Sequence, residues 1–168
     1  MNDINTPLST SSKHRLLFIC LGNICRSPAA EAVMKAKVHA AGLDSQFVID
    51  SAGIGNWHVG QLPDSRMRSR GALRGYRLDS HARQISQHDF DDFDLLLVMD
   101  DGNYRAVTEL ARDNADRQKV KMLTSYLTAH KGATTVPDPY YGGTADFDHA
   151  LDLIEDACDG LLSNITEK

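Results

Sequence analysis

A short loop near the start of the chain begins with a cysteine and ends with an arginine. It reads Cys20-Leu21-Gly22-Asn23-Ile24-Cys25-Arg26, and Ser27 follows it. Between a strand and the N-terminus of a helix, the backbone N–H groups of such a loop can point inward and cradle an anion. The Arg26 guanidinium can hold two oxygens of a phosphate, and Gly22 lets the backbone approach the anion closely. We therefore predict that this loop binds a phosphate group.

Cys20 stands where it can attack a phosphate bound in this loop. Positive potential at a helix N-terminus favours the thiolate, which is the nucleophilic form of cysteine. The Ser27 hydroxyl can stabilise that thiolate when it leaves. The spacing of Cys20 and Arg26 is a weak signal by itself, because chance often produces it. Its position between an expected strand and an expected helix favours a catalytic loop over a buried cysteine and a solvated arginine.

The elements that position this loop follow from the pattern of apolar residues. The apolar run over 15–20 is typical of a strand buried on both faces. Ser27 as N-cap, Pro28 in the first helical position and Gly42 after the last turn predict a helix that ends near Ala41.

Strands and helices alternate along the rest of the chain. We expect strands over 47–51, 94–100 and 120–123, and helices over 63–75, 103–113 and 145–164. The pattern predicts an α/β fold, a single domain of three layers with a central four-stranded parallel sheet and helices on both faces. The phosphate-binding loop follows the first strand, at the sheet edge where ligands of such folds bind.

Length and composition argue against several classes of protein. The 168 residues suggest one domain, and we expect a flexible tail over 1–13 followed by a single domain over 14–168. A net charge of −5 argues against a nucleic-acid binder. No apolar run reaches the roughly 18 residues of a membrane span, so we expect no membrane partner.

The cysteines and the N-terminus point to the cytoplasm. The three cysteines cannot all pair, and the N-terminus lacks the apolar stretch of a secretory signal, so we expect reduced thiols in a cytoplasmic protein. No cysteine and histidine cluster has the spacing of a zinc site, so we expect no metal and no other cofactor.

The run Cys20–Glu31 resembles the signature of the low-molecular-weight protein tyrosine phosphatases. Four later stretches resemble the same family in the same order: Asp50–Gly53 with Trp57, Ala82–Ile85, Met99–Asp100 and Asp138–Gly142. The resemblance covers about residues 15–165. It implies a metal-independent enzyme that hydrolyses phosphotyrosine through a phosphocysteine intermediate on Cys20, with Arg26 binding the phosphate.

The resemblance also implies a general acid. Asp138 lies between Pro137 and Pro139, and turn propensities alone make it an ordinary turn residue. By resemblance, Asp138 protonates the phenolic oxygen and then acts as a base on the hydrolytic water. A positioned acid of this kind contributes about 10²–10⁴-fold to the rate.

Further site residues follow from the resemblance. Trp57, Tyr140 and Tyr141 would line the mouth of the pocket. Asn23 and Ser51 would hold the loop in shape by hydrogen bonds. A histidine that often supports this network is replaced by Ser80, so a supporting role goes to Ser80 and not to His81.

Cys25 would trap oxidised Cys20 as a reversible disulfide, whereas a small buried thiol is the plain alternative. Cys158 falls on the apolar stripe of the last helix and is expected in the core. Six arginines between residues 66 and 83 are expected to be solvated surface, with steering of phosphorylated substrates as the alternative: Arg66, Arg68, Arg70, Arg74, Arg77 and Arg83.

Other activities on this fold stay open. Thiol-dependent arsenate reductases share the loop but relay oxidation through two outside cysteines, and only Cys158 lies outside it here. Phosphoarginine phosphatases tend to carry Thr in place of Ile24 and lack the paired tyrosines. A non-catalytic phosphate-binding module is disfavoured because Cys20, Arg26 and Asp138 are all present.

The resemblance implies tyrosine-phosphorylated protein substrates, with a tyrosine kinase as one candidate. We expect a monomer or a weak dimer.

Overall fold

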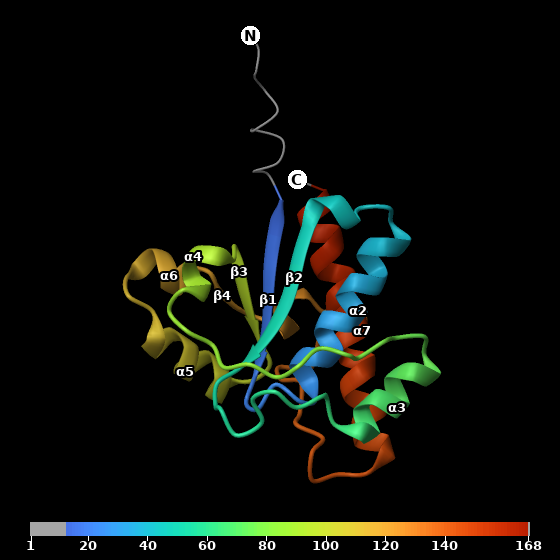
Figure 1. Cartoon of the computed structure of the whole chain (residues 1–168). Coiled ribbons are helices and arrows are strands. Elements are labelled where there is room, and N and C mark those ends of the chain that lie inside the picture. Colours follow the sequence, from blue (N-terminus) through green and yellow to red (C-terminus); the bar gives the residue numbers. More distant parts are fainter. Residues whose placement is uncertain (1–12, 168) are drawn as a thin grey trace.

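Four strands form one parallel sheet at the centre of the protein (Figure 1). They are β1 (His14–Cys20), β2 (Phe47–Gly53), β3 (Leu95–Val98) and β4 (Val120–Met122). Their order is β2-β1-β3-β4, and every neighbouring pair is parallel. The computed structural model describes residues 13–167. Apart from Lys13, the expected tail over 1–13 lies outside the described residues.

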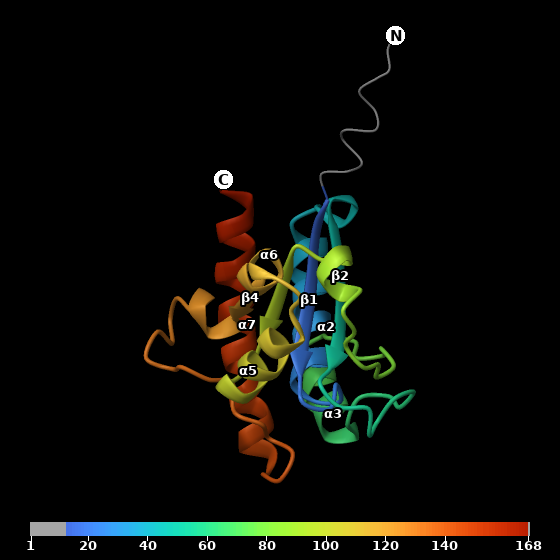
Figure 2. The same cartoon turned by 90° about the vertical axis from the view of Figure 1, so that its left-hand side faces the viewer.

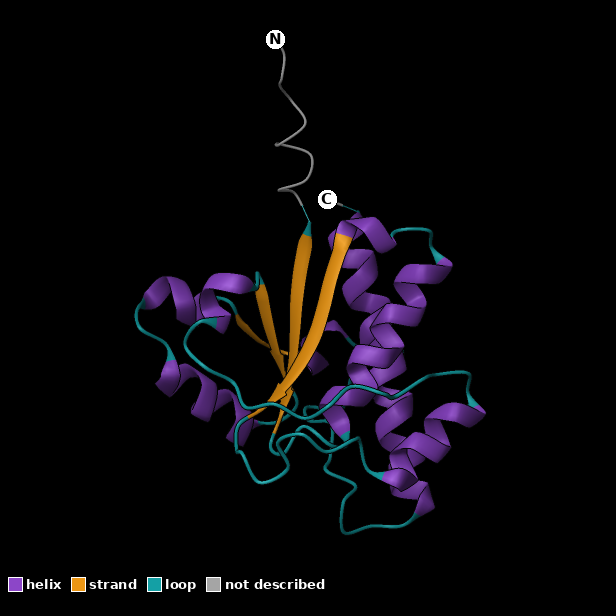
Figure 3. Ribbon diagram, viewed as in Figure 1, coloured by secondary structure: helices purple, strands orange, loops and turns teal. Residues whose placement is uncertain are grey.

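Helices cover both faces of this sheet, as Figures 2 and 3 show. One face carries α2 (Arg26–Ala40), α3 (Ser65–Leu73) and α7 (Thr144–Thr166). The other carries α4 (Asp89–Asp92), α5 (Asp101–Leu110) and α6 (Asn114–Gln118). Two short 3-10 helices, η1 (Asp44–Gln46) and η2 (Leu123–Tyr126), complete the elements of the described residues. The predicted three-layer α/β fold is confirmed, and none of the helices within residues 13–167 is long and apolar enough to cross a bilayer.

The central strand β1 is buried on both faces. Leu16 and Phe18 pack in the core under α2 and α7, while Leu17 and Ile19 pack in the second core on the opposite face. This alternation follows from the period of two in a strand, which sends neighbouring side chains to opposite sides. The carboxyl end of β1, where Cys20 lies, is therefore held from both sides of the sheet.

The start of α2 differs from the expectation. The helix begins at Arg26 with Cys25 as its N-cap residue, so the prediction of Ser27 as the N-cap is wrong. The reason lies in the site, because the Ser27 side chain bonds the Cys20 sulfur and not the helix backbone. The predicted end of the helix is confirmed by Gly42, which adopts a φ of 72° directly after the last turn.

Two short helices were not expected, and two capping aspartates shift other boundaries. α4 and α6 have four and five residues, too few to produce an apolar period. Asp100 caps α5 by accepting a hydrogen bond from Asn103 N at 2.8 Å, so this helix begins two residues earlier than predicted. Asp64 caps α3 in the same way, and its helix begins at Ser65 and not at Pro63.

The arginines between residues 66 and 83 are mostly paired, so their prediction as solvated surface is wrong for several of them. Arg70 and Arg74 bind carboxylates of α7 at Asp148, Asp152 and Glu155. These contacts tie α3 to α7 across the helical layer. Arg83 likewise pairs with two aspartates, Asp50 and Asp89.

Cys158 on α7 is fully buried in the core, as predicted.

Candidate active site

The predicted phosphate loop lies between the end of β1 and the start of α2, at the floor of a pocket of about 290 Å³. The loop is fixed to the end of β2 by hydrogen bonds from Ile54 N to Cys20 O and from Gly55 N to Leu21 O, both 2.9 Å. Of the predicted residues, those that line this pocket are Cys20, Leu21, Gly22, Ile24, Cys25, Arg26, Trp57, Asp138, Tyr140 and Tyr141.

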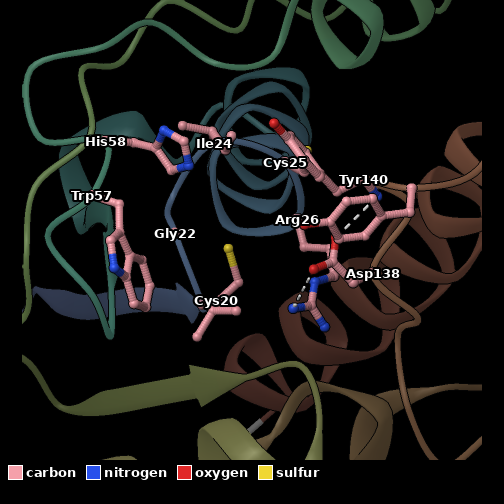
Figure 4. Close-up of a pocket in the computed structure, with 11 residues that line it drawn as sticks. Cys20, Gly22, Ile24, Cys25, Arg26, Trp57, His58, Asp138 and Tyr140 are labelled. Atoms are coloured by element: carbon pink, nitrogen blue, oxygen red, sulfur yellow. Dashed lines mark hydrogen bonds and ion pairs between the residues drawn. The ribbon is translucent and has the colours of Figure 1, made fainter.

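The Cys20 sulfur sits in the middle of this pocket, between Trp57 on one side and Asp138 with Tyr140 on the other (Figure 4). The Ser27 hydroxyl lies 3.0 Å from the sulfur, and the Ser27 backbone N–H donates to it at 3.4 Å. Both groups sit at the N-terminal end of α2, where the helix dipole is positive. A thiolate on Cys20 would therefore have two donors and a favourable field.

Arg26 is almost completely buried, at 2% exposure, and the three nitrogens of its guanidinium differ in their partners. Its Nη1 donates to Asp100 Oδ2 at 2.8 Å and to the Val136 carbonyl at 2.9 Å. Its Nη2 is 3.6 Å from Asp138 Oδ2. Its Nε has no hydrogen-bond partner within the described part of the chain. A buried donor without a partner is costly, and a bound oxyanion would satisfy it.

Asp138 reaches the pocket from the loop between β4 and α7. Val136 N donates to Met99 O at 2.8 Å, which fixes this loop to the end of β3 two residues before Asp138. One carboxylate oxygen accepts from Tyr140 N at 3.1 Å, and the other faces Arg26. The side chain is 40% exposed and lines the same pocket as the phosphate loop.

The aromatic rim is open to the outside. Trp57 is 64% and Tyr141 96% exposed, and the two tyrosine rings meet edge to face with centroids 4.9 Å apart. Tyr140 is half-buried, and the Arg66 guanidinium lies 5.4 Å from its ring while donating to its carbonyl oxygen. An aromatic group that entered the pocket would meet these rings on two sides.

Asn23 and Ser51 are both 2% exposed and hydrogen-bond one another behind the loop. Asn23 Nδ2 donates to Ser27 Oγ at 2.7 Å and to Ser51 Oγ at 3.0 Å. Ser51 in turn donates to Glu31 Oε1 at 2.6 Å, and Lys35 binds the other oxygen of that carboxylate. Within residues 13–167, neither Ser80 nor His81 contributes a hydrogen bond to this network.

Sequence reasoning assigned no site role to four residues that the structure brings here. His58 lines the pocket beside Gly22, Asp100 orients Arg26, Glu31 ends the Asn23 network, and Arg83 N donates to Asn23 Oδ1 at 3.0 Å. The one available signal was that most of them fall inside the stretches quoted for the family resemblance. Within the described residues, no group of three or more histidine, cysteine and carboxylate side chains is arranged to hold a metal.

Comparison with known proteins identifies the family. A family model described as low molecular weight phosphotyrosine protein phosphatase matches residues 15–168. A Synechocystis sp. protein whose name places it in the same family is 52% identical over 153 residues, which are 90% of this chain and 96% of that protein.

Solved structures agree. The crystal structure of a protein tyrosine phosphatase from Entamoeba histolytica, with Hepes in its active site, has a TM-score of 0.89 at 44% identity and covers 92% of this chain and 98% of that one. A structure described as a drosophila arginine phosphatase has a TM-score of 0.83 at 33% identity and covers 89% and 96%.

The chain therefore belongs to the low molecular weight phosphotyrosine protein phosphatase family. It is a protein-tyrosine-phosphatase, a hydrolase of phosphoric monoesters, as the resemblance implied.

Proposed function

We propose that the chain hydrolyses phosphotyrosine in proteins through a phosphocysteine on Cys20, with Arg26 binding the phosphate and Asp138 as general acid and base. The observation that carries this proposal is the buried guanidinium of Arg26, a residue that lines the pocket of the Cys20 sulfur: within the described residues its Nε has no hydrogen-bond partner, and its Nη2 is only weakly paired with Asp138. Two such donors match two oxygens of a phosphate dianion.

In the first step, the Cys20 thiolate attacks phosphorus and the bond from phosphorus to the phenolic oxygen breaks. Protonated Asp138 gives its proton to that oxygen, so tyrosine leaves as a neutral phenol. Arg26 and the loop amides hold the equatorial oxygens, where negative charge builds up in the transition state.

In the second step, water attacks the phosphorus of the phosphocysteine and gives a proton to the Asp138 carboxylate. The bond between phosphorus and sulfur breaks, and inorganic phosphate is released. The Ser27 hydroxyl, 3.0 Å from the sulfur, stabilises the departing thiolate and so favours this step.

Phosphotyrosine fits the rim better than phosphoarginine. The pocket is lined by Trp57, Tyr140 and Tyr141, whose rings can stack on a phenyl group. Ile24 adds apolar surface and has no hydroxyl that a guanidino group could bind. The drosophila neighbour makes phosphoarginine the second substrate to assay.

Arsenate reduction has less support. A thiol relay needs cysteines that can move electrons away from the loop, and Cys158 is completely buried, with a pKa raised by burial. Cys158 also does not line the pocket that contains Cys20, so it is not placed to take up oxidation from the loop.

The decisive experiment measures hydrolysis of para-nitrophenyl phosphate and of a phosphotyrosine peptide at about pH 6 with a chelator present. We expect activity in the wild type, none in Cys20→Ser, and full activity in the control Cys158→Ala. Asp138→Ala should lose about 10²-fold on the peptide and less on para-nitrophenyl phosphate, because nitrophenolate leaves without a proton. Activity that survives Cys20→Ser would overturn the proposal.

The remaining expectations belong to the same proposal. We propose a catalytic domain over 14–168 behind a tail over 1–13, acting in the cytoplasm on tyrosine-phosphorylated proteins, a tyrosine kinase among them. The three cysteines are unpaired, which suits a reducing compartment. We propose a monomer or a weak dimer, which sedimentation would test.

A further inference from the structure

A short segment beside β2 contacts the phosphate loop from outside it. Gln84 forms a parallel bridge with Gly53 at the end of β2, and Ile85 N donates to Gly53 O at 2.8 Å. Arg83 uses both of its backbone groups here. Its carbonyl accepts from Gly53 N at 2.8 Å, and its N–H donates to Asn23 Oδ1 at 3.0 Å. The Arg83 backbone therefore joins β2 to the phosphate loop.

Asn23 depends on such contacts because its backbone is in an unfavourable region. Its φ is 59°, and within residues 13–167 it is the one residue other than glycine with a positive φ. This region is disfavoured for residues that carry a side chain, although asparagine tolerates it better than most. The Asn23 side chain is held by three hydrogen bonds, from Arg83 N and to Ser27 and Ser51. Loss of one of these bonds would weaken the loop conformation.

The Arg83 side chain forms an ion-pair triad on the other side of this contact. Its guanidinium binds both oxygens of Asp89, at 3.0 and 3.2 Å, and Asp50 Oδ2 at 3.0 Å. Asp89 is 5% exposed and also accepts from Ser86 N at 2.9 Å. Asp50 directly precedes Ser51, and its Oδ1 accepts a hydrogen bond from Ser51 N at 2.8 Å. The triad thus links the segment of Arg83 to β2 and to the start of α4.

We propose that Arg83 is a positioning residue for the phosphate loop. Its ion pairs with Asp50 and Asp89 hold its backbone N–H against Asn23 and so keep the loop in its anion-binding shape. Arg83 does not line the pocket, and its effect on the reaction runs through Asn23. This inference rests on the proposed function, because it takes the loop to bind the substrate phosphate.

The test measures inhibition by inorganic phosphate together with kcat and KM for para-nitrophenyl phosphate. Arg83→Met keeps the apolar stem and removes both ion pairs. We expect the inhibition constant for phosphate to rise about tenfold and kcat/KM to fall about tenfold, the scale of one lost hydrogen bond to the loop. If kcat/KM falls but the inhibition constant for phosphate does not change, the proposal is wrong, because a distorted phosphate loop would also bind phosphate more weakly.

Arg112→Met is the matched control. Arg112 also pairs with two aspartates, Asp91 and Asp116, but contacts no residue of the phosphate loop. We expect its phosphate constant and kcat/KM to stay within about twofold of the wild type. An equal loss in both arginine variants would assign the effect to stability and overturn the role of Arg83.

A double-mutant cycle with Asn23→Ala tests the route. If Arg83 acts through Asn23, Arg83→Met should change the phosphate constant by less than about twofold in the Asn23→Ala background. If the effects of the two substitutions on the phosphate constant multiply, the proposal is wrong.

If circular dichroism shows that Arg83→Met does not fold, Asp89→Asn is tested in its place, because it removes one ion pair of Arg83 and keeps an acceptor for Ser86 N. A phosphate constant equal to that of the wild type in Asp89→Asn would also overturn it.

Cys20→Ser, assayed alongside, separates this inference from the proposed function. Activity in Cys20→Ser would overturn the proposed function itself. An inactive Cys20→Ser with an unchanged Arg83→Met would overturn only the role of Arg83.

Discussion

Arg26 divides its guanidinium between the protein and the pocket. Asp100 and the Val136 carbonyl hold Nη1, while Nη2 lies 3.6 Å from Asp138 Oδ2 and Nε has no hydrogen-bond partner among the described residues. The Asp100 and Val136 contacts fix the plane of the guanidinium, and we propose that Nη2 and Nε bind the anion. A planar fork fixed in this way loses little conformational freedom on binding, which a lysine could not reproduce.

Two substitutions of Asp100 should therefore distinguish its effect on phosphate binding from its effect on the stability of α5. Its Oδ2 orients Arg26 and its Oδ1 caps α5. Asp100→Asn keeps a good cap and removes the charge beside Arg26, so we expect kcat/KM to fall about tenfold with little change in the free energy of unfolding. Asp100→Ala should add a loss of about 1 kcal/mol from the missing cap. Steady-state kinetics and urea denaturation measure the two effects, and equal stability of the two variants would contradict the capping role.

Cys25 should protect Cys20, the proposed nucleophile, from permanent oxidation. Burial, together with the nearby carboxylate of Asp64, raises the pKa of Cys25, so it stays a thiol and does not compete for the substrate. When peroxide oxidises Cys20 to a sulfenic acid, the Cys25 sulfur can attack it, and water leaves as the disulfide forms. We expect dithiothreitol to restore most activity of peroxide-treated wild type and little of Cys25→Ser. Equal recovery, with no disulfide peptide in mass spectra, would rule this role out.

At the scale of elements, α7 holds η2 and the segment that follows it in place. Asp156 on α7 accepts hydrogen bonds from the backbone N–H groups of Thr128, Ala129 and His130. One turn later, Gly160 packs against the backbone of Tyr126 in η2. The segment that follows η2 runs on to Asp138, so the packing of α7 also supports the residue that we propose as the general acid.

Gly160→Ala should destabilise the protein, although helix propensity alone predicts a gain of about 1 kcal/mol. An added Cβ would stand 1.9 Å from the Tyr126 carbonyl oxygen, which belongs to the backbone and cannot rotate away. We expect a loss of about 1–3 kcal/mol in the free energy of unfolding, measured with urea. Ser163→Ala on the exposed side of α7 is the control and should stay within about 0.5 kcal/mol of the wild type. A stabilised Gly160→Ala would show that α7 and η2 are packed less closely than the structure indicates.

At the scale of the whole molecule, ion pairs and buried carboxylates join elements that the sheet does not connect. Arg70 and Arg74 tie α3 to α7, and Arg112 ties α4 to α6 through Asp91 and Asp116. Isolated surface pairs add little, but a carboxylate that loses its charge also loses its hydrogen bonds. The stability of the fold should therefore depend on pH on the acid side.

The free energy of unfolding should fall as the pH drops from about 4 to about 2. Burial alone would raise the pKa of Asp156, but hydrogen bonds from Thr128, Ala129 and His130 outweigh it and hold this pKa below its usual range. Hydrogen bonds from Arg112 lower the pKa of Asp116 to about 2. A depressed folded-state pKa stabilises the fold above the unfolded value of about 3.9, and this stabilisation is lost as the pH falls toward the folded value.

Asp156→Asn tests this prediction. It removes the titrating group and keeps the side-chain shape, so the free energy of unfolding should depend less steeply on pH below 4 than in the wild type. Denaturation at several pH values measures the slope. Equal slopes for the wild type and Asp156→Asn would mean that other carboxylates carry the acid sensitivity.

Much of the fold could be predicted because it rests on local patterns. The apolar run before Cys20 and the periodic stripe of α7 encode a buried strand and an amphipathic helix within one stretch of chain, and both were predicted at nearly their observed bounds. Helix starts were less accurate, because Asp64, Asp100 and Ser27 have side chains whose partners decide whether they cap. The helices α4 and α6 are too short to show the periodic spacing of apolar residues that predicts a helix.

The α/β class and the loop that joins a cysteine, an arginine and a helix N-terminus follow from the sequence, because they depend on residues close together in the chain. Three contacts follow only from the folded structure: Asp100 orients Arg26, Glu31 ends the Asn23 network, and Arg83 contacts the loop. These contacts join residues brought together by the parallel sheet, whose crossovers return distant segments to one edge. A hydrogen bond depends on the final position of both partners, and no local pattern specifies that position.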